Sequence, residues 1–243
     1  MIDHVTIRVS DLDASRRFYE HAFDLLAYAP EPSVDPAFPE WSDFSIAAAE
    51  DELSVTRRLH VGYQAASRDE VDAWWRAMTA AGSPDGGAPG PRPEYGATYY
   101  GAFVVGPDGN SVEAVHNGPL RDDGTVIDHL WLRVRDLDAA SHFYEAVAPV
   151  VGYEVTRHED RTRIHGDGAS FSVLAGPPTE NVHLAFSAPD RETVEAFHLA
   201  GLEAGHASLG EPGERPQYHV GYYGAYLRDP DGNNIEAVFH DRR

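Results

Sequence analysis

The sequence contains no cysteine and no lysine. Without cysteine the chain cannot form disulfides, thiolate metal sites or a cysteine nucleophile, so any metal ligand must offer nitrogen or oxygen. All 19 basic residues are arginine, and they stand against 40 acidic residues, which gives a formal net charge of −21. This charge disfavours nucleic acid and anionic membrane as partners.

Long apolar runs and low-complexity tracts are also absent. The N-terminus does not show a basic region followed by an apolar core, as a secretory signal would. A chain of 243 residues, 42% of them hydrophobic, can bury a sizeable core as one large or two small domains. We therefore expect a soluble cytoplasmic protein that does not enter a membrane.

One stretch of the sequence occurs twice. Residues 218–238 place β-prone residues on both sides of Pro230-Asp231-Gly232-Asn233, which is typical of two strands joined by a tight turn. Residues 95–115 repeat this pattern, and the glutamates that follow the two turns lie 236 − 113 = 123 residues apart. The chain therefore reads as a duplication of about half its length.

Each half begins with a β-α unit and contains a second one. Residues 3–9 alternate apolar and polar side chains and precede a segment with apolar residues at helical spacing. The same pattern restarts at three further places, residues 59–65, 128–134 and 182–187. We predict four such units in two domains, residues 1–118 and 126–243, with a linker at residues 119–125.

Each half offers the same metal-ligand candidates, two histidines and one glutamate on predicted strands. They are His4, His60 and Glu113 in the first half, and His129, His183 and Glu236 in the second. A single strand histidine is usually an ordinary surface or core residue, but two matched trios opposite the apolar face favour a metal site in a concave sheet. We favour Fe²⁺ or Mn²⁺ for this set of ligands, and it also suits Ni²⁺ or Zn²⁺.

The repeated units, each half ending in a hairpin that carries Pro-Asp-Gly-Asn and then glutamate, resemble the vicinal oxygen chelate superfamily. This superfamily includes glyoxalase I, extradiol ring-cleaving dioxygenases, methylmalonyl-CoA epimerase and bleomycin or fosfomycin resistance proteins. The resemblance covers residues 2–116 and 127–240. It implies an α+β fold in which four βαβββ modules form two domains, with cupped mixed sheets, outer helices and a divalent metal in the cup. Modules could pair within each half or be exchanged between halves, and a homodimer is compatible with the pattern.

The resemblance also separates two reaction types. Glyoxalase I uses four protein ligands, whereas the corresponding segments here, residues 44–47 and 171–174, offer no carboxylate, amide or imidazole, which disfavours a true glyoxalase. Extradiol dioxygenases have two histidines and one glutamate on iron, preceded by a histidine and a tyrosine that His219 and Tyr226 match. Ala225 and Gln217 depart from the usual pattern of that family.

His219 and Tyr226 are therefore our candidate catalytic residues, because a catechol must lose protons and its oxygenated intermediate must regain one. The first half has Gly96 and Phe103 at these positions, so we predict that its cup is catalytically weaker or structural. Tyr226 could instead only fill a strand, and His219 could only close the hairpin.

Our leading hypothesis is a metal-dependent, extradiol-dioxygenase-like enzyme that acts on a small aromatic or vicinal-oxygen substrate. One alternative is a protein that binds an antibiotic or metabolite without chemistry, in a cup lined by aromatic side chains. A further alternative is a glyoxalase-like lyase or epimerase that uses glutamate as a base.

Overall fold

The computed structural model describes residues 2–31, 37–51, 54–166 and 168–241. Contacts within the chain divide it into two compact units: unit 1 comprises residues 1–5 and 131–243, and unit 2 comprises residues 6–130. The boundaries between the units fall inside two strands, β1 (Ile2–Val9) and β8 (Ile127–Val134). Unit 1 therefore contains the start of β1, from the first half of the sequence, and unit 2 contains the start of β8, from the second half.

Unit 2 contains two α-helices and two groups of hydrogen-bonded strands. Its elements are α1 (Leu12–Asp24), β2 (Glu40–Trp41), β3 (Phe44–Ala48), β4 (Leu59–Gln64), α2 (Arg68–Ala80), β5 (Asp85–Pro91), β6 (Tyr100–Val105) and β7 (Ser111–His116). The strands follow the orders β5-β6-β7-β4-β8 and β1-β3-β2. Because β4 pairs with β7 in parallel and β6 with β7 antiparallel, the first group is mixed.

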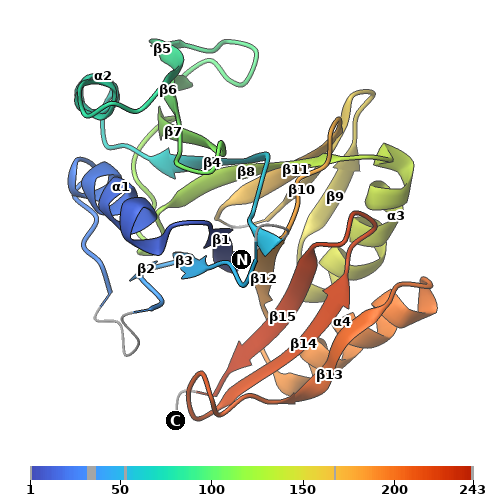
Figure 1. Cartoon of the computed structure of the whole chain (residues 1–243). Helices are drawn as coiled ribbons and strands as arrows, with labels where there is room; N and C mark the ends of the chain where they lie inside the picture. Colours follow the sequence, from blue (N-terminus) through green and yellow to red (C-terminus); the bar gives the residue numbers. More distant parts are fainter. Residues whose placement is uncertain (1, 32–36, 52–53, 167, 242–243) are drawn as a thin grey trace. The chain divides into compact units, whose positions relative to one another are not determined.

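Unit 1 repeats this plan. Its elements are α3 (Leu137–Val147), a 3₁₀ helix η2 (Ala148–Val151), β9 (Glu154–Arg157), β10 (Arg161–His165), β11 (Ser170–Ala175), β12 (Val182–Ser187), α4 (Arg191–Glu203), β13 (Ser208–Glu214), β14 (Tyr222–Arg228) and β15 (Asn234–His240). The strands follow the orders β13-β14-β15-β12-β1 and β8-β11-β10-β9. The predicted α+β fold of βαβββ modules is confirmed (Figure 1).

All four α-helices begin after a side chain that caps a backbone amide in the first turn. The caps are Asp11, Ser67, Asp136 and Asp190. Each accepts a hydrogen bond from the residue three positions later, which satisfies an amide that has no partner inside the helix. None of the described helices is long and apolar enough to cross a membrane.

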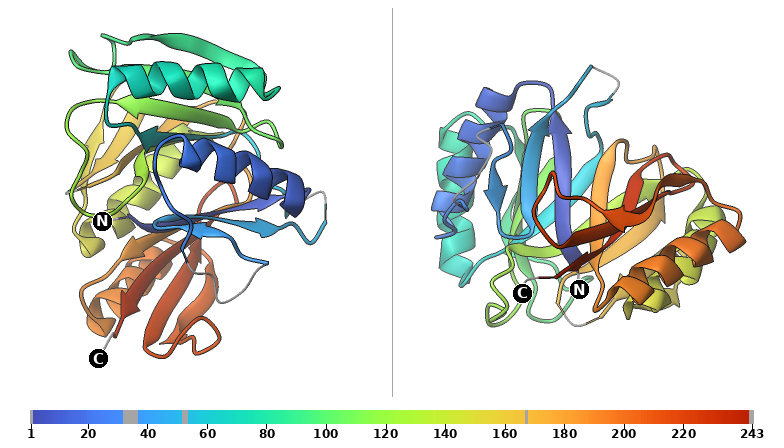
Figure 2. Two further views of the ribbon diagram at one scale, coloured as in Figure 1. Left: turned by 90° about the vertical axis from the view of Figure 1, so that its left-hand side faces the viewer. Right: turned by 90° about the horizontal axis from the view of Figure 1, so that it is seen from below.

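Helices cover one face of the strands in each unit. Within unit 2, α1 and α2 lie side by side, and within unit 1, α3 and α4 do the same (Figure 2). The indole Nε1 of Trp74 donates to Ala22 O at 3.1 Å and joins α2 to α1. Apolar side chains of the strands point to these helices, so the polar alternate side chains, including the predicted ligand histidines, point to the opposite face.

The two predicted tight turns are present and set the register of the last hairpins. Gly109 and Gly232 have φ of 82° and 100°, which glycine adopts without strain. Beyond the second turn, β14 and β15 pair so that Tyr226 lies opposite Glu236. The turn therefore fixes which strand residues stand beside the glutamate.

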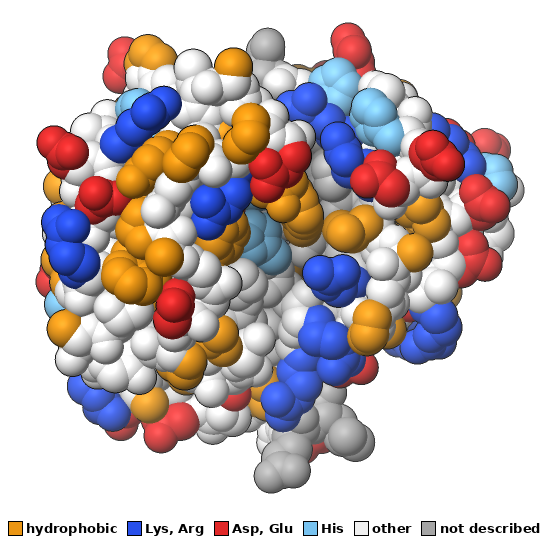
Figure 3. All heavy atoms as spheres, turned by 90° about the horizontal axis from the view of Figure 1, so that it is seen from above, with side chains coloured by type: hydrophobic (Ala, Val, Ile, Leu, Met, Phe, Trp, Pro, Cys, Tyr) orange, Lys and Arg blue, Asp and Glu red, His pale blue; other side chains and the backbone are white. Residues whose placement is uncertain are grey.

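Charged side chains are spread over the surface. On the face drawn in Figure 3, acidic side chains and arginines are interspersed. This distribution agrees with a net charge that serves solubility.

Candidate metal centres

The structure brings the six predicted ligands together in two clusters. One consists of His4, His183 and Glu236 in unit 1, and the other of His60, Glu113 and His129 in unit 2. In each cluster the ligand atoms lie within 4.8 Å of one another. The trios formed by each half of the sequence are thus not the ones that meet in space.

Strand order explains this exchange. The first residues of β1 stand next to β12, and those of β8 stand next to β4. His4 therefore meets the histidine and glutamate of the second half, and His129 meets those of the first half. The histidines point to the predicted face with either neighbouring strand, because side chains alternate between the two faces along a strand whichever strand it pairs with.

In unit 1 the carboxylate of Glu236 lies under two imidazoles. Its Oε2 is 3.0 Å from His183 Nε2 and 3.7 Å from His4 Nε2, and the two Nε2 atoms are 3.0 Å apart. The hydroxyl of Tyr222 donates to Glu236 Oε1 at 2.8 Å. Oε2 is buried and accepts no hydrogen bond of ordinary geometry, although it faces the His183 imidazole, so a cation or a proton can still bind it.

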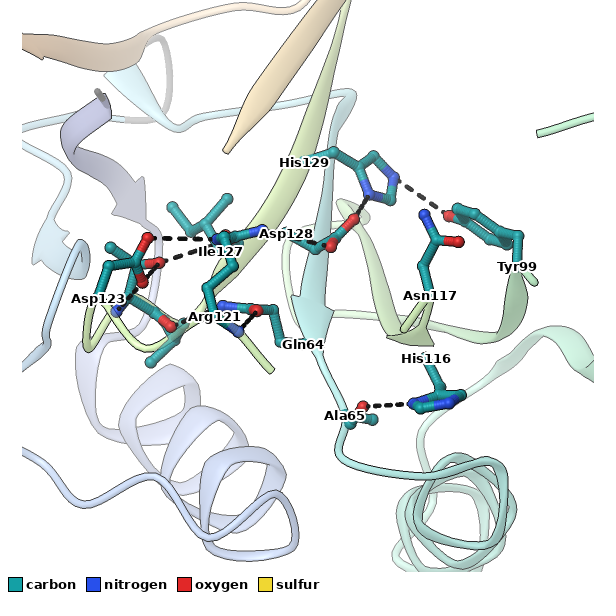
Figure 4. Close-up of polar contacts among 12 residues, drawn as sticks. Gln64, Ala65, Tyr99, His116, Asn117, Arg121, Asp123, Ile127, Asp128 and His129 are labelled. Carbon is teal, nitrogen blue, oxygen red and sulfur yellow. Dashed lines mark hydrogen bonds and ion pairs between the residues drawn. The ribbon is translucent and has the colours of Figure 1, made fainter. Parts of the chain in front are cut away.

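In unit 2 the corresponding carboxylate is more fully bonded. His60 Nε2 is 3.1 Å from Glu113 Oε2 and 3.1 Å from His129 Nε2. The Tyr99 hydroxyl is 2.8 Å and 3.0 Å from the two oxygens of Glu113, and 3.4 Å from His129 Nε2. Figure 4 shows His129 between Asp128 and Tyr99.

Ion pairing shapes the charges in unit 2. Burial alone would raise the pKa of Glu113, but bonds and charges from His129 and His60 lower this pKa to about 2. Burial alone would lower the pKa of His129, but Asp128 and Glu113 raise it to about 9. A carboxylate held ionised beside imidazoles is a donor set that a divalent cation can use once it displaces the imidazole proton.

Each ligand histidine has a second partner on Nδ1. His4 contacts Asp3 at 2.9 Å and His129 contacts Asp128 at 2.9 Å. His60 contacts Ser111 Oγ at 2.9 Å. An N–H on Nδ1 that donates to such a partner leaves the Nε2 lone pair for the cluster, as is usual for metal-bound histidine.

The fourth histidine fits the same rule. The Asn234 amide is 2.8 Å from His183 Nδ1, and its Oδ1 is buried without a hydrogen bond. An amide can be turned so that oxygen and nitrogen exchange places. With the oxygen on His183, Nδ1–H donates to it and the buried oxygen is satisfied, while a proton between the Nε2 atoms of His183 and His4, which lie 3.0 Å apart, is the one that a cation would displace.

Glycines allow the carboxylates to approach the neighbouring strand closely. A Cβ on Gly224 would stand closer to Glu236 Oε1 than van der Waals contact allows, and a Cβ on Gly101 would do the same to Glu113 Oε1. Gly62 has this relation to the ring of His129. These glycines were not among the predicted site residues, although the repeated Tyr-Tyr-Gly at 99–101 and 222–224 was a signal for two of them.

The residues present fit a divalent cation. Two imidazole nitrogens and one buried carboxylate form a set that holds iron, manganese, nickel or zinc and leaves coordination positions for a substrate. In the part of the chain that the structure describes, no fourth histidine, aspartate or glutamate joins either cluster. Ser45, in the segment where a fourth ligand was sought, shares a hydrogen bond of 2.8 Å with the Thr6 hydroxyl.

The two predicted catalytic residues have different positions. The ring of Tyr226 lies 6.2 Å from that of His183, and its buried hydroxyl makes no hydrogen bond within the usual limits. Burial and then the charge of Glu236 raise the pKa of Tyr226 well above its ordinary value. His219 is not in the cluster, since its Nε2 lies 2.8 Å from His240 Nδ1.

Asp3, Asp128 and His240 are site residues that sequence reasoning missed. The dipeptide Asp-His at 3–4 recurs at 128–129, which was an available signal for the two aspartates. His240 has no such repeat, because Asn117 stands at its position in the first half.

The sequence matches a family model over residues 1–114 and 126–237, that of the Glyoxalase/Bleomycin resistance protein/Dioxygenase superfamily. The chain belongs to this superfamily. The expected family is thus confirmed, and the two matched ranges give this superfamily member two tandem copies of the domain.

Two curated relatives of this superfamily member are named as lyases. They are a putative lactoylglutathione lyase of Brassica oleracea var. gemmifera and the lactoylglutathione lyase GLX1 of Arabidopsis thaliana. Each is 31% identical over 152 residues, which cover 58% of this chain and 52% of the relative. The chain spans about half the length of the curated relatives it matches.

Solved structures show the same fold. Glyoxalase I from Zea mays is 20% identical, with a TM-score of 0.68 and coverage of 98% of this chain and 92% of the other. A putative dioxygenase from Bacillus subtilis subsp. subtilis str. 168 is 14% identical, with a TM-score of 0.66 and coverage of 99% and 85%. The likeness to both shows that one fold serves differently named proteins.

Proposed function

We propose that the protein is a divalent-metal-dependent lyase or isomerase of glyoxalase I type, and that the cluster of unit 1 is its reactive site. The observation that carries the proposal is Glu236 Oε2, which is buried, makes no hydrogen bond and lies beside the Nε2 atoms of His183 and His4. The names of the two relatives at 31% identity support a lyase. This reading favours the lyase alternative over the dioxygenase that we expected first.

His4, His183 and Glu236 would hold the cation, and we favour Fe²⁺ or Mn²⁺, with Ni²⁺ and Zn²⁺ as alternatives. A bound divalent cation would supply Lewis-acid polarisation of the oxygens on two adjacent substrate carbons. Because Tyr222 bonds Oε1, Glu236 Oε2 would serve the cation and the substrate in turn, and it would give up the cation when two substrate oxygens approach the site.

Glu236 would then act as the base. Its Oε2 takes the proton from the carbon next to a polarised carbonyl, and the electron pair of that C–H bond moves toward the carbonyl oxygen. Glu236 Oε2 then returns the proton to the former carbonyl carbon, while the proton of the neighbouring hydroxyl moves to the former carbonyl oxygen. Atoms and electrons balance, so the reaction is an isomerisation that needs no oxidant. Tyr222 bonds Oε1 and so keeps the carboxylate orientation fixed while Oε2 works.

The experiment is an assay for lactoylglutathione formation from methylglyoxal and glutathione. Protein freed of metal is loaded separately with Fe²⁺, Mn²⁺, Ni²⁺ and Zn²⁺, and thioester formation is followed by absorbance. We expect turnover with at least one metal and its loss after EDTA treatment. If a metal-loaded protein turns over neither this adduct nor adducts of other α-oxoaldehydes, the proposal is wrong.

One observation favours a second candidate, extradiol ring cleavage. Each cluster contains two histidines and one glutamate without a second carboxylate among the described residues, and Tyr226 lies next to His183. Facial sites of this composition hold the iron of oxygenases. Cleavage of catechols by the Fe²⁺-loaded protein under O₂, with α-oxoaldehyde adducts unchanged, would replace the lyase by a dioxygenase.

A further inference from the structure

A row of four side chains in unit 1 connects the ligand His4 to the rim of the unit. His4 Nδ1 lies 2.9 Å from Asp3 Oδ1, and the same carboxylate lies 3.1 Å from His240 Nε2. On its other side His240 Nδ1 lies 2.8 Å from His219 Nε2, and the two rings stack with centroids 5.0 Å apart. His219 Nδ1 lies 2.9 Å from the carbonyl oxygen of Val220.

The partners fix most of the proton positions in this row. A carboxylate and a carbonyl only accept hydrogen bonds, so His240 Nε2 and His219 Nδ1 both carry a proton. His240 Nε2–H therefore donates to Asp3, and the stacked His219 ring holds the His240 ring in this orientation.

Unit 2 reaches the same arrangement with a different residue. Asp128, which bonds His129 as Asp3 bonds His4, lies 3.5 Å from the Nη1 atom of Arg121. Arg121 also donates to the carbonyl of Ile127, at the start of the same strand (Figure 4). At the positions of His240 and His219 this unit has Asn117, bonded to Thr98, and Gly96. In both units an outer side chain, His240 or Arg121, thus holds the aspartate that holds a ligand histidine.

We propose that His240, supported by His219, is a positioning residue for the metal site of unit 1. It fixes the Asp3 carboxylate, and Asp3 in turn keeps the proton of His4 on Nδ1 and the Nε2 lone pair directed into the space between Glu236 and His183, where a cation would bind. Arg121 has the equivalent role for His129. The inference rests on the proposed function, because it takes His4 as a ligand.

The first test is Mn²⁺ binding by the full chain, measured by electron paramagnetic resonance of the free ion. The His60→Ala background leaves only the unit 1 cluster intact, and the His183→Ala background leaves only the unit 2 cluster intact. In the first background we expect His240→Leu to weaken binding about 10-fold or more, as the loss of outer partners of metal ligands generally does. His240→Gln, whose amide N–H can still donate to Asp3, should restore binding to within about threefold of the parent.

The matched control makes the same substitution in the background that keeps only the unit 2 cluster. In the His183→Ala background, His240→Leu should leave Mn²⁺ binding unchanged, whereas Arg121→Met should weaken it. Equal losses with leucine and glutamine at position 240, or no loss with either, would overturn the proposal. Thermal unfolding of each variant shows whether it folds, and His219→Gln provides a milder change at the outer end of the row.

The second test needs neither metal nor activity. The ¹⁵N shifts of the His4 ring report which nitrogen carries the proton. We expect the proton on Nδ1 in the metal-free parent and in His240→Gln, and a mixture of both tautomers in His240→Leu. An unchanged tautomer in His240→Leu would refute the positioning role. If the parent binds none of Fe²⁺, Mn²⁺, Ni²⁺ and Zn²⁺, the proposed function fails, and the tautomer measurement still decides what His240 does.

Discussion

The two clusters use the same ligands but leave their carboxylates in different states. In unit 2, Tyr99 lies within hydrogen-bond distance of both oxygens of Glu113. In unit 1, Tyr222 bonds Oε1 of Glu236, and Oε2 has no hydrogen bond. A base needs an oxygen that a substrate can reach, so under the proposed function we expect the chemistry in unit 1.

The exposed fractions of the ligand histidines also differ between the two units. The side chains of His4 and His183 are 23% and 20% exposed, against 16% and 10% for His60 and His129. The cluster of unit 1 is therefore the more open of the two. A duplicated ligand set thus does not imply duplicated activity, because the residues around the ligands decide what each set can do.

The largest expected effect comes from changing each glutamate to its amide. Glu236→Gln should lower kcat for lactoylglutathione formation by about 10²–10⁴, the range of a lost general base. Glu113→Gln should lower kcat much less, because its carboxylate is already occupied by Tyr99. Steady-state kinetics with the metal content of each variant measured beside it tests this, and the reverse order of effects would assign the reaction to unit 2.

A second difference concerns Asp43, a buried acid of unit 2 whose counterpart in the second half is Ser170. Asp43 Oδ1 accepts the amides of Val126 and Ile127 at 2.8 Å and 3.2 Å, just before the strand that carries His129. Burial raises the pKa of Asp43 to about 6, although these bonds oppose the rise. The folded state thus binds this proton more tightly than the unfolded chain, and stability is lost as pH rises from 3.8 towards 6.

Asp43→Asn removes that titration. The free energy of unfolding of the variant, relative to the parent, should rise by on the order of 2–3 kcal/mol between pH 4 and pH 7. Chemical denaturation of the metal-free proteins at several pH values measures the difference. Ser170 occupies the corresponding position in the second half, so Ser170→Ala is the matched control and should show no such pH dependence. Parallel curves for Asp43→Asn and the parent would contradict the raised pKa.

The sequence predicted all six cluster residues, because histidine and glutamate recur in phase on strands of known alternation. It left open which of them meet, since strand neighbours are set by packing over long separations and not by local period. The contact of Asp3 with His240 joins residues 237 positions apart. The different states of Glu113 and Glu236 could not be predicted either, because they depend on hydroxyl positions within a few tenths of an ångström.

A smaller effect is expected where a glycine makes room for a ligand. Gly62 lies under the ring of His129, and a methyl group there would overlap it. At the matching position of the second half stands Ala185, so unit 1 already accommodates a Cβ. Gly62→Ala should displace His129 and destabilise the fold by about 1–3 kcal/mol, the usual cost of overpacking.

Mn²⁺ binding in the two single-cluster backgrounds checks the location of this effect. Gly62→Ala should weaken binding by the unit 2 cluster and leave that of unit 1 unchanged. Ala185→Gly is the control and should affect neither cluster appreciably. Normal binding by unit 2 in Gly62→Ala would show that the His129 ring can move without loss of the site.

The smallest expected effect makes unit 1 resemble unit 2 at one position. Tyr226 corresponds to Phe103, and its hydroxyl is buried without a hydrogen bond. Removal of an unsatisfied buried hydroxyl does not destabilise a protein, so Tyr226→Phe should be as stable as the parent or about 1 kcal/mol more stable.

The effect of Tyr226→Phe on activity separates the two candidate reactions. A lyase that relies on Glu236 should keep its kcat within about twofold, the scale of a change of about 0.5 kcal/mol. A dioxygenase that moves a proton through Tyr226 should instead lose about 10²–10⁴ in rate. Tyr226→Phe, assayed with both substrate classes and beside Phe103→Tyr, therefore shows whether the extra hydroxyl of unit 1 belongs to the chemistry or only to the packing of its strand.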